Sequence, residues 1–201
     1  MGIFVVIEGP DGTGKTTLVN GLKNKFTENN ISFYAFREPG GTEVGEKLRD
    51  ILLDPSLDMT HETEALLFAA MRCENVRKVK EKIDENDIIL ADRFILSSIA
   101  YQGYGLGLDP KKVEMINDFG IYGFRPDLTI VLMMDSKDGI SRKKTQKDLD
   151  RLEQRDLDFH KRLEDAYRQF ISEDTDKVVI DANKSKEEIL EEAFSIIKEN
   201  M

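Results

Sequence analysis

Residues 9–16 have side chains and spacing that could hold phosphate groups. Their sequence, Gly-Pro-Asp-Gly-Thr-Gly-Lys-Thr, fits the pattern G-x-x-x-x-G-K-[ST]. Glycines let successive backbone N–H groups turn toward phosphate oxygens, Lys15 can reach the β- and γ-phosphates, and the Thr16 hydroxyl can bind Mg²⁺. We therefore expect a phosphate site made of Gly9, Pro10, Asp11, Gly12, Thr13, Gly14, Lys15, Thr16 and Thr17.

The sequence on either side of this segment supports the same interpretation. Residues 3–7 are continuously apolar, which is typical of a buried parallel strand. Leu18, Leu22 and Phe26 recur every four residues, which predicts a helix over residues 15–29. Such a helix directs the positive end of its dipole at a bound anion. This context disfavours the alternative, an incidental glycine-rich turn.

Short apolar runs alternate with helical patterns along the chain. The runs cover residues 3–7, 33–36, 88–91, 128–134 and 178–180. This alternation predicts a parallel sheet with helices on both faces, in one domain spanning residues 1–201. In such a sheet, ligands bind beyond the carboxyl ends of the strands.

Arginines follow the second run and lie on the helix predicted over residues 43–53. The net charge is −10, from 29 basic and 39 acidic residues, so an anionic substrate needs a local cationic cluster. Arg37, at a strand end, and Arg49, on the helix, are candidates for that cluster. Either could instead be an ordinary surface charge.

An aspartate and an arginine follow the third run. Asp92 resembles the second magnesium ligand of nucleotide-binding loops, and Arg93 could clamp an anion beside it. Asp135 and Asp181 also end apolar runs, so the pattern does not choose among the three aspartates.

Two pairs of side chains could recognise a base. Phe68 and Arg72 are four residues apart on a helix expected to begin after Thr60, so an aromatic plane and a guanidinium share one face. Ser98 and Gln102 are also four apart on the next helix and could read a base edge. The simpler alternatives are a core Phe beside a surface Arg, and two polar residues facing water.

The apolar surface around residues 65–71 also suggests contact with a second subunit.

Residues 141–155 are rich in basic side chains. They could form a solvated helix face, or a lid that brings cations onto phosphates.

The single cysteine and the lack of a secretory signal predict a cytoplasmic protein. No apolar run is long enough to span a membrane, and the acidic balance argues against nucleic acid or membrane surfaces as partners.

Taken together, these segments resemble the thymidylate kinase family. The resemblance covers nearly the whole chain, in the family's order and spacing. It is carried by the phosphate loop and by Arg-Glu-Pro-Gly-Gly (37–41), Phe-Ala-Ala-Met-Arg (68–72), Asp-Arg-Phe (92–94), Ala-Tyr-Gln-Gly (100–103) and Arg-Pro-Asp-Leu-Thr (125–129). It implies a five-stranded P-loop fold with a short helical lid. It also implies transfer of the ATP γ-phosphoryl group to dTMP with Mg²⁺, by a homodimer.

The resemblance also implies roles for single residues. Lys15 and the loop amides would hold the ATP phosphates, and Arg93 would bridge donor and acceptor phosphates. Arg37 and Arg49 would hold the acceptor phosphate, and Asp11 would take the sugar 3′-hydroxyl. Phe68 would stack on thymine. The polar edge of the base would form hydrogen bonds with Arg72, Ser98 and Gln102.

The lid assignments follow the bacterial type of the family. One branch has an arginine inside the phosphate loop, whereas this chain has Thr13 before Gly14. The resemblance then implies that Arg151, or secondarily Arg142, supplies the missing charge, and that Glu153 orders the waters of the metal.

Two other functions remain open at this point. The first is another P-loop kinase that acts on a different small nucleotide or on a nucleoside. The second is a GTP-dependent switch, suggested by the loose guanine-reading pattern Thr-Gln-Lys-Asp at residues 145–148.

Overall fold

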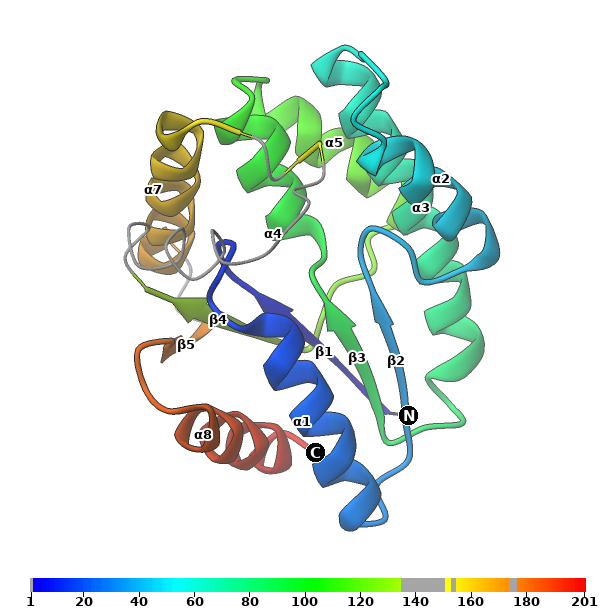
Figure 1. Cartoon of the computed structure of the whole chain (residues 1–201). Helices are drawn as coiled ribbons and strands as arrows, with labels where there is room; N and C mark the ends of the chain where they lie inside the picture. The colour runs from blue at the N-terminus through cyan, green and yellow to red at the C-terminus, as the bar shows by residue number, and fades with distance from the viewer. Residues whose placement is uncertain (1, 135–150, 153–154, 174–176) are drawn as a thin grey trace.

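The computed structural model describes residues 2–134, 151–152, 155–173 and 177–201. Within them, five strands form one parallel sheet in the order β2-β3-β1-β4-β5 (Figure 1). This confirms the α/β fold expected from the sequence. The strands are β1 (Ile3–Glu8), β2 (Phe33–Arg37), β3 (Ile88–Asp92), β4 (Leu128–Met133) and β5 (Lys177–Asp181).

The strand register aligns the carboxyl ends of the three strands that lead into the predicted site. Asp92 at the end of β3 lies opposite Arg37 of β2 and opposite Ile7 of β1. The loops that leave these strands therefore meet beyond the carboxyl ends of the strands. Both chain termini lie toward the opposite, amino ends (Figure 1).

Helices cover both faces of the sheet because side chains alternate along each strand. Val5 and Ile7 pack against α1 (Lys15–Glu28) and α8 (Lys186–Glu199), which lie together on one face (Figure 1). Phe4 and Val6 face the other way, where the core is completed by α3 (His61–Lys82), α5 (Pro110–Ile121) and α7 (Leu157–Glu173).

The helix starts follow the capping residues in the sequence. Gly14 caps α1 in a left-handed conformation (φ 92°), which a glycine adopts without strain. The Thr42 hydroxyl accepts a hydrogen bond from Gly45 N at 3.0 Å and begins α2 (Glu43–Leu53), and Thr60 begins α3 in the same way.

One helix assignment from the sequence is wrong. Ser98 and Gln102 do not share a regular α-helix: Ser98 ends the short helix α4 (Ile95–Ser98), and Gln102 lies in a π-helical segment, η1 (Ile99–Gly105). A π-helix has a wider turn than an α-helix, so the four-residue spacing does not fix a common face. Both side chains are nevertheless buried, so the alternative that they face water is also wrong.

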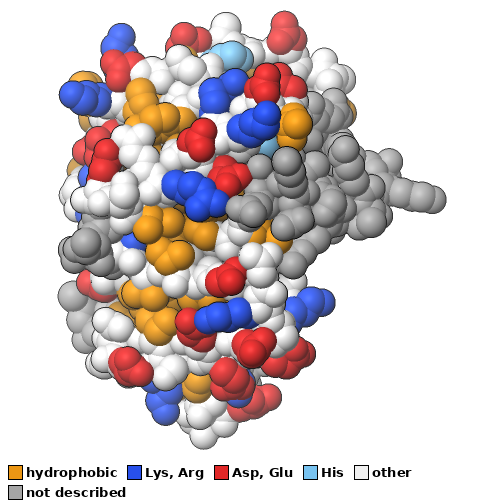
Figure 2. Space-filling view, turned by 90° about the vertical axis from the view of Figure 1, so that its left-hand side faces the viewer, with side chains coloured by type: hydrophobic (Ala, Val, Ile, Leu, Met, Phe, Trp, Pro, Cys, Tyr) orange, Lys and Arg blue, Asp and Glu red, His pale blue; other side chains and the backbone are white. Residues whose placement is uncertain are grey.

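None of the described helices is both long and apolar enough to cross a membrane. On the face shown in Figure 2, acidic and basic side chains are interspersed among hydrophobic ones. The predicted lid at residues 141–155 lies largely outside the described residues, which include only 151, 152 and 155 of that range.

Candidate functional site

A cavity of about 820 Å³ lies at the carboxyl edge of the sheet. It brings together most of the residues predicted from the sequence. The predicted residues that line it are Asp11, Gly12, Thr13, Gly14, Lys15, Thr16, Thr17, Arg37, Arg49, Phe68, Arg72, Asp92, Arg93, Ser98 and Gln102. Of the remaining predicted residues, Gly9, Pro10 and Arg151 do not line it, and Arg142 and Glu153 lie outside the described residues.

Lys15 occupies the centre of the phosphate loop. Its ammonium nitrogen donates to the carbonyl oxygens of Gly9 and Pro10 at 2.9 and 2.7 Å. Burial, and then the nearby Arg93 charge, lower the pKa of Lys15 to about 7. A bound polyphosphate would supply the negative charge that this site needs to hold Lys15 in its protonated form.

Gly9 fixes the position of the loop against the sheet. Its φ is 137°, and a Cβ atom built there would lie 2.2 Å from the carbonyl oxygen of Leu132 in β4. No other residue type fits this approach, so Gly9 acts through backbone packing beneath the cavity.

The structure distinguishes two of the three aspartates that the sequence left open. Asp92 lines the cavity, and its carboxylate accepts a hydrogen bond from the Thr16 hydroxyl at 3.0 Å. Asp181 instead accepts hydrogen bonds from the backbone and side chain of Asn183, both at 2.9 Å. Asp135 lies outside the described residues. Mg²⁺ is usually bound by one or two protein oxygens together with substrate phosphates and water, and the Thr16–Asp92 pair fits that donor set.

Arg93 connects the two halves of the cavity. Its guanidinium pairs with Asp11, donates to Ser97 Oγ at 3.0 Å and to Tyr101 Oη at 2.9 Å, and lies 4.9 Å from the centre of the Tyr101 ring. Arg93 also has a φ of 76°, a left-handed conformation that non-glycine residues seldom adopt. These contacts hold a cation between the phosphate loop and the predicted base pocket.

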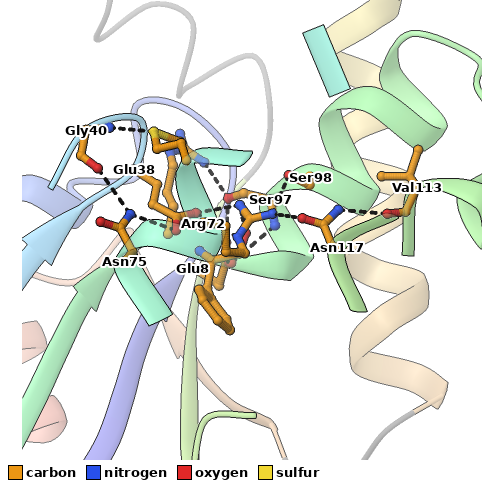
Figure 3. A network of polar contacts seen from close by, with 12 residues as sticks. Glu8, Glu38, Gly40, Arg72, Asn75, Ser97, Ser98, Val113 and Asn117 are labelled. Atoms are coloured by element: carbon orange, nitrogen blue, oxygen red, sulfur yellow. Dashed lines mark hydrogen bonds and ion pairs between the residues drawn. The ribbon is translucent and has the colours of Figure 1, made fainter. Parts of the chain in front are cut away.

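A buried carboxylate, Glu8, secures the backbone that carries Arg93. It accepts hydrogen bonds from Phe94 N at 2.8 Å and Ser97 Oγ at 2.6 Å, and Tyr167 donates to it at 3.0 Å. The Glu8–Ser97 part of this network appears in Figure 3. Since Glu8 ends β1 directly before the phosphate loop, it ties that loop to the start of α4.

Arg37 and Arg49 lie on neighbouring walls of the cavity. Arg37 is exposed and pairs with Glu46 at 3.2 Å. Arg49 donates to the carbonyl oxygen of Pro39 at 2.6 Å. The Arg37 pair is solvent-exposed and therefore weak, so an entering phosphate can compete with Glu46.

Arg72 is fully buried, which rules out a surface arginine at this position. Its guanidinium donates to Glu38 at 2.9 and 2.5 Å, to Ser98 Oγ at 2.8 Å, to the carbonyl oxygen of Phe94 at 3.0 Å, and to Asn117 (Figure 3). These five contacts match its five N–H groups. A base that bonds Arg72 must therefore share or replace one of these partners.

Among the side chains around Arg72, Glu38, Asn75 and Asn117 have no role predicted from the sequence. Glu38 forms a buried ion pair with Arg72, and it also accepts from Asn75 Nδ2 at 3.1 Å (Figure 3). Burial raises the pKa of Glu38, and the Arg72 and Asn75 contacts act in the opposite direction. Glu38 lies in the Arg-Glu-Pro-Gly-Gly motif, so its place in that motif was the available signal. Asn75 and Asn117 lie in no recognised motif, so no sequence signal indicated them.

Gln102 presents an unsatisfied acceptor at the base pocket. Its amide nitrogen donates to Glu64 Oε1 at 3.1 Å, while its buried Oε1 has no hydrogen-bond partner among the described residues. A buried polar atom left unpaired costs roughly 1–3 kcal/mol. Phe68 and Ser98 line the same cavity, so an aromatic face, a hydroxyl and this acceptor are available to a planar ligand.

Glu64 is a further residue with no site role predicted from the sequence. Its side chain is buried, and Arg151 and Arg155 contact its Oε2 at 2.7 and 3.0 Å. Arg151 also donates to the carbonyl oxygen of Leu52 at 2.8 Å. The structure therefore places Arg151 against Glu64 and the end of α2, and not against the phosphate loop.

Comparisons with known proteins agree with this geometry. A family model described as thymidylate kinase matches residues 7–193. Proteins named thymidylate kinase from Staphylococcus haemolyticus and Bacillus cereus (strain ATCC 10987) are each 40% identical to this chain, over 98% and 100% of its length and 98% and 99% of theirs. One from Finegoldia magna is 37% identical over 98% of both chains. These matches show that the chain belongs to the thymidylate kinase family.

Proposed function

We propose that the residues lining the cavity carry out the reaction of this family, transfer of the ATP γ-phosphoryl group to dTMP. The observation that carries this proposal is the joining of a phosphate loop and a base pocket in one cavity, with Arg93 between them. Family membership makes the protein a thymidylate kinase that uses ATP. The roles of single residues, the metal and the assembly are the proposed part.

On the donor side, the loop amides and Lys15 hold the β- and γ-phosphates. Lys15 must first release the carbonyl oxygens of Gly9 and Pro10, to which it now donates. Thr16 and Asp92 would hold Mg²⁺, and Glu153, which lies outside the described residues, would order the waters of the metal. When bound, Mg²⁺ would neutralise charge on the β- and γ-phosphates.

On the acceptor side, Arg37 and Arg49 hold the 5′-phosphate of dTMP, and Asp11 accepts a hydrogen bond from the 3′-hydroxyl. Phe68 stacks on thymine. The base carbonyls accept hydrogen bonds from the Ser98 hydroxyl and Arg72. Gln102 Oε1 accepts the N3–H of the base, which pairs the acceptor that is unsatisfied without ligand.

The transfer step requires positioning and electrostatics more than covalent chemistry. An oxygen of the dTMP phosphate forms a bond to the γ-phosphorus as the bond to the β-phosphate oxygen breaks, giving ADP and dTDP. Arg93 contacts both phosphates and neutralises charge that develops between them. A further positive charge from the lid would come from Arg142, which lies outside the described residues, or from Arg151 after it leaves Glu64.

We also propose that the protein is a homodimer through α3 and α5. These helices pack closely, since a Cβ on Gly120 of α5 would lie 3.3 Å from the carbonyl oxygen of Ala69 and from Cys73 Cβ of α3. Large apolar side chains remain exposed on them: Leu66 (55%), Met115 (67%), Phe119 (85%) and Tyr122 (77%), which follows α5. Met115 and Phe119 are four residues apart and share a helix face, as a partner surface requires.

An acceptor panel with ATP and Mg²⁺ tests the proposed substrate. The purified protein is assayed with dTMP, dUMP, dCMP, UMP and CMP, and kcat/KM is measured for each. We expect dTMP to be the best acceptor, as in its family. Its N3–H and carbonyl groups complement the pocket and separate it from dCMP and CMP, whereas dUMP and UMP carry the same groups and test the 5-methyl group and the sugar. Faster turnover of UMP or CMP would instead support the alternative of a kinase for another small nucleotide. The GTP-switch alternative rested on residues 145–148, which lie outside the described residues.

A further inference from the structure

The side-chain amide of Gln102 is held in one orientation by Glu64. Gln102 Nε2 donates to Glu64 Oε1 at 3.1 Å, and this leaves Gln102 Oε1 as the atom with no partner in the described part of the chain. Turning the amide over would place its oxygen beside the carboxylate, where two acceptors repel each other. The contact with Glu64 therefore decides whether Gln102 offers an acceptor or a donor to the cavity.

Glu64 can impose this orientation because it acts only as an acceptor. Arg151 and Arg155 contact its Oε2 at 2.7 and 3.0 Å, and the two guanidinium groups stabilise its negative charge. Its other oxygen remains for Gln102. The carboxylate is buried, with a side-chain exposure of 3%, so water does not compete strongly for either oxygen.

We propose that Glu64 is a positioning residue that sets base specificity, by fixing the Gln102 amide so that it accepts from the N3–H of thymine and rejects cytosine. The N3 atom of thymine carries a hydrogen and donates, whereas N3 of cytosine is an acceptor. With Gln102 Oε1 facing it, cytosine would bring two acceptors together in a buried site. The inference rests on the proposed contact between Gln102 and the base.

Glu64→Gln tests the inference directly. The new amide can either donate to or accept from Gln102, so the Gln102 amide becomes free to turn. The two acceptors to compare are dTMP and 5-methyl-dCMP, which differ only in the hydrogen-bonding edge of the base. We expect the ratio of kcat/KM for dTMP over that for 5-methyl-dCMP to fall by about tenfold or more, as expected for loss of a buried hydrogen-bond discriminator.

The ratio separates specificity from general damage. Loss of the ion pairs to Arg151 and Arg155 lowers turnover of both acceptors alike and cancels in the ratio. Glu62→Gln, an exposed residue on the first turn of the same helix, is the matched control and should leave the ratio unchanged. Glu64→Asp keeps an acceptor-only carboxylate, so it should retain the preference for dTMP even if its turnover falls.

A double-mutant cycle with Gln102→Met shows whether Glu64 acts through Gln102. We expect Gln102→Met to lower the ratio, and Glu64→Gln to have no further effect on it in that background. If Gln102→Met lowers the ratio but Glu64→Gln leaves it within about twofold of the wild type, Glu64 does not set specificity, although the base contact stands.

Other results also decide the matter. An unchanged ratio in Gln102→Met removes both the base contact and the inference built on it. If Glu64→Gln does not fold, Glu64→Asp decides alone: retained dTMP preference supports the inference, and a preference lost in a folded Glu64→Asp protein overturns it.

Discussion

Lys15 lies in the phosphate loop, where its ammonium group donates to two carbonyl oxygens of the same loop. Its environment opposes the charge that ATP binding needs, since burial and Arg93 lower its pKa to about 7. Arg93 lies beside Lys15. Its guanidinium forms an ion pair with Asp11 and a hydrogen bond with Tyr101. These two cations give different responses to pH, because a guanidinium stays protonated over the working range and a buried ammonium does not.

We expect ATP binding to take up a proton at about pH 8. Above about pH 7 much of the free protein has neutral Lys15, because its pKa is lowered to about 7. Bound phosphates raise this pKa, so Lys15 becomes protonated in the complex and ATP affinity falls as the pH rises through that region. Calorimetry at one pH, in two buffers with different ionisation enthalpies, measures the proton uptake. Lys15→Arg should abolish it, and proton release by the wild type would contradict the assignment.

Arg93→Ala should lower kcat by about a thousandfold or more, because a cation that contacts the transferring phosphoryl is removed. The fold should persist, since the variant leaves the hydrophobic core unchanged, although Asp11 loses its ion pair with Arg93. Steady-state kinetics with ATP and dTMP measure the effect. Arg77→Ala, which removes an exposed arginine on α3, is the control and should retain normal turnover. Near-normal kcat in Arg93→Ala would exclude Arg93 from the mechanism.

At the scale of elements, the site depends on how closely η1 and α7 approach each other. A Cβ built on Gly105 of η1 would lie 2.5 Å from the ring of Phe159 in α7. Arg162 of α7 donates to the carbonyl oxygen of Gly105 at 2.8 Å. Phe159 also packs edge-on against Tyr101, which contacts Arg93. The packing of these two elements is therefore connected to the position of Arg93, the arginine proposed to act in catalysis.

Gly105→Ala should destabilise the protein by about 1–3 kcal/mol, the usual cost of overpacking a core. It should also lower kcat, because a shift of Phe159 moves Tyr101. Urea denaturation gives the free energy of unfolding, and steady-state kinetics give kcat. Replacing Phe159 by Leu in the Gly105→Ala protein makes room for the new methyl group, so part of the lost activity should return. If the double variant is no more active than Gly105→Ala alone, the effect does not pass through Phe159.

At the scale of the whole molecule, an acidic protein has a locally cationic cavity. The net charge is −10, yet Lys15, Arg37, Arg49 and Arg93 line one space. Two nucleotide polyanions can therefore enter where the local field is favourable, despite the overall sign of the charge. The exposed apolar side chains of α3 and α5 are the second feature at this scale, because Leu66, Met115 and Phe119 are each more than half exposed in the single chain.

Phe119→Glu should shift the protein from dimer to monomer. A charge at a side chain that is 85% exposed in the single chain costs little there, but it would be buried against the partner. Sedimentation velocity over a range of protein concentrations measures the association. Leu157→Glu, at an exposed apolar residue on the first turn of α7, is the control and should remain dimeric. A monomeric wild-type protein, or a dimeric Phe119→Glu variant, would argue against this interface.

Features that depend only on residues close together in the chain could be predicted from the sequence. The phosphate loop, the apolar strands and the caps at Gly14, Thr42 and Thr60 are local patterns of backbone and side-chain chemistry, so they could be recognised without a structure. Family motifs extended this to the residues of the base pocket.

Contacts between side chains that are far apart in the sequence became known from the fold alone. It placed Asp92 on Thr16, buried Arg72 among Glu38, Ser98 and Asn117, and brought Glu64 to Gln102. These partners lie on different elements, and their contacts depend on strand order, on the π-helical turn of η1 and on helix packing. A hydrogen bond forms only over a few ångströms, so residue spacing along the chain cannot reveal it until the fold has set the separation in space.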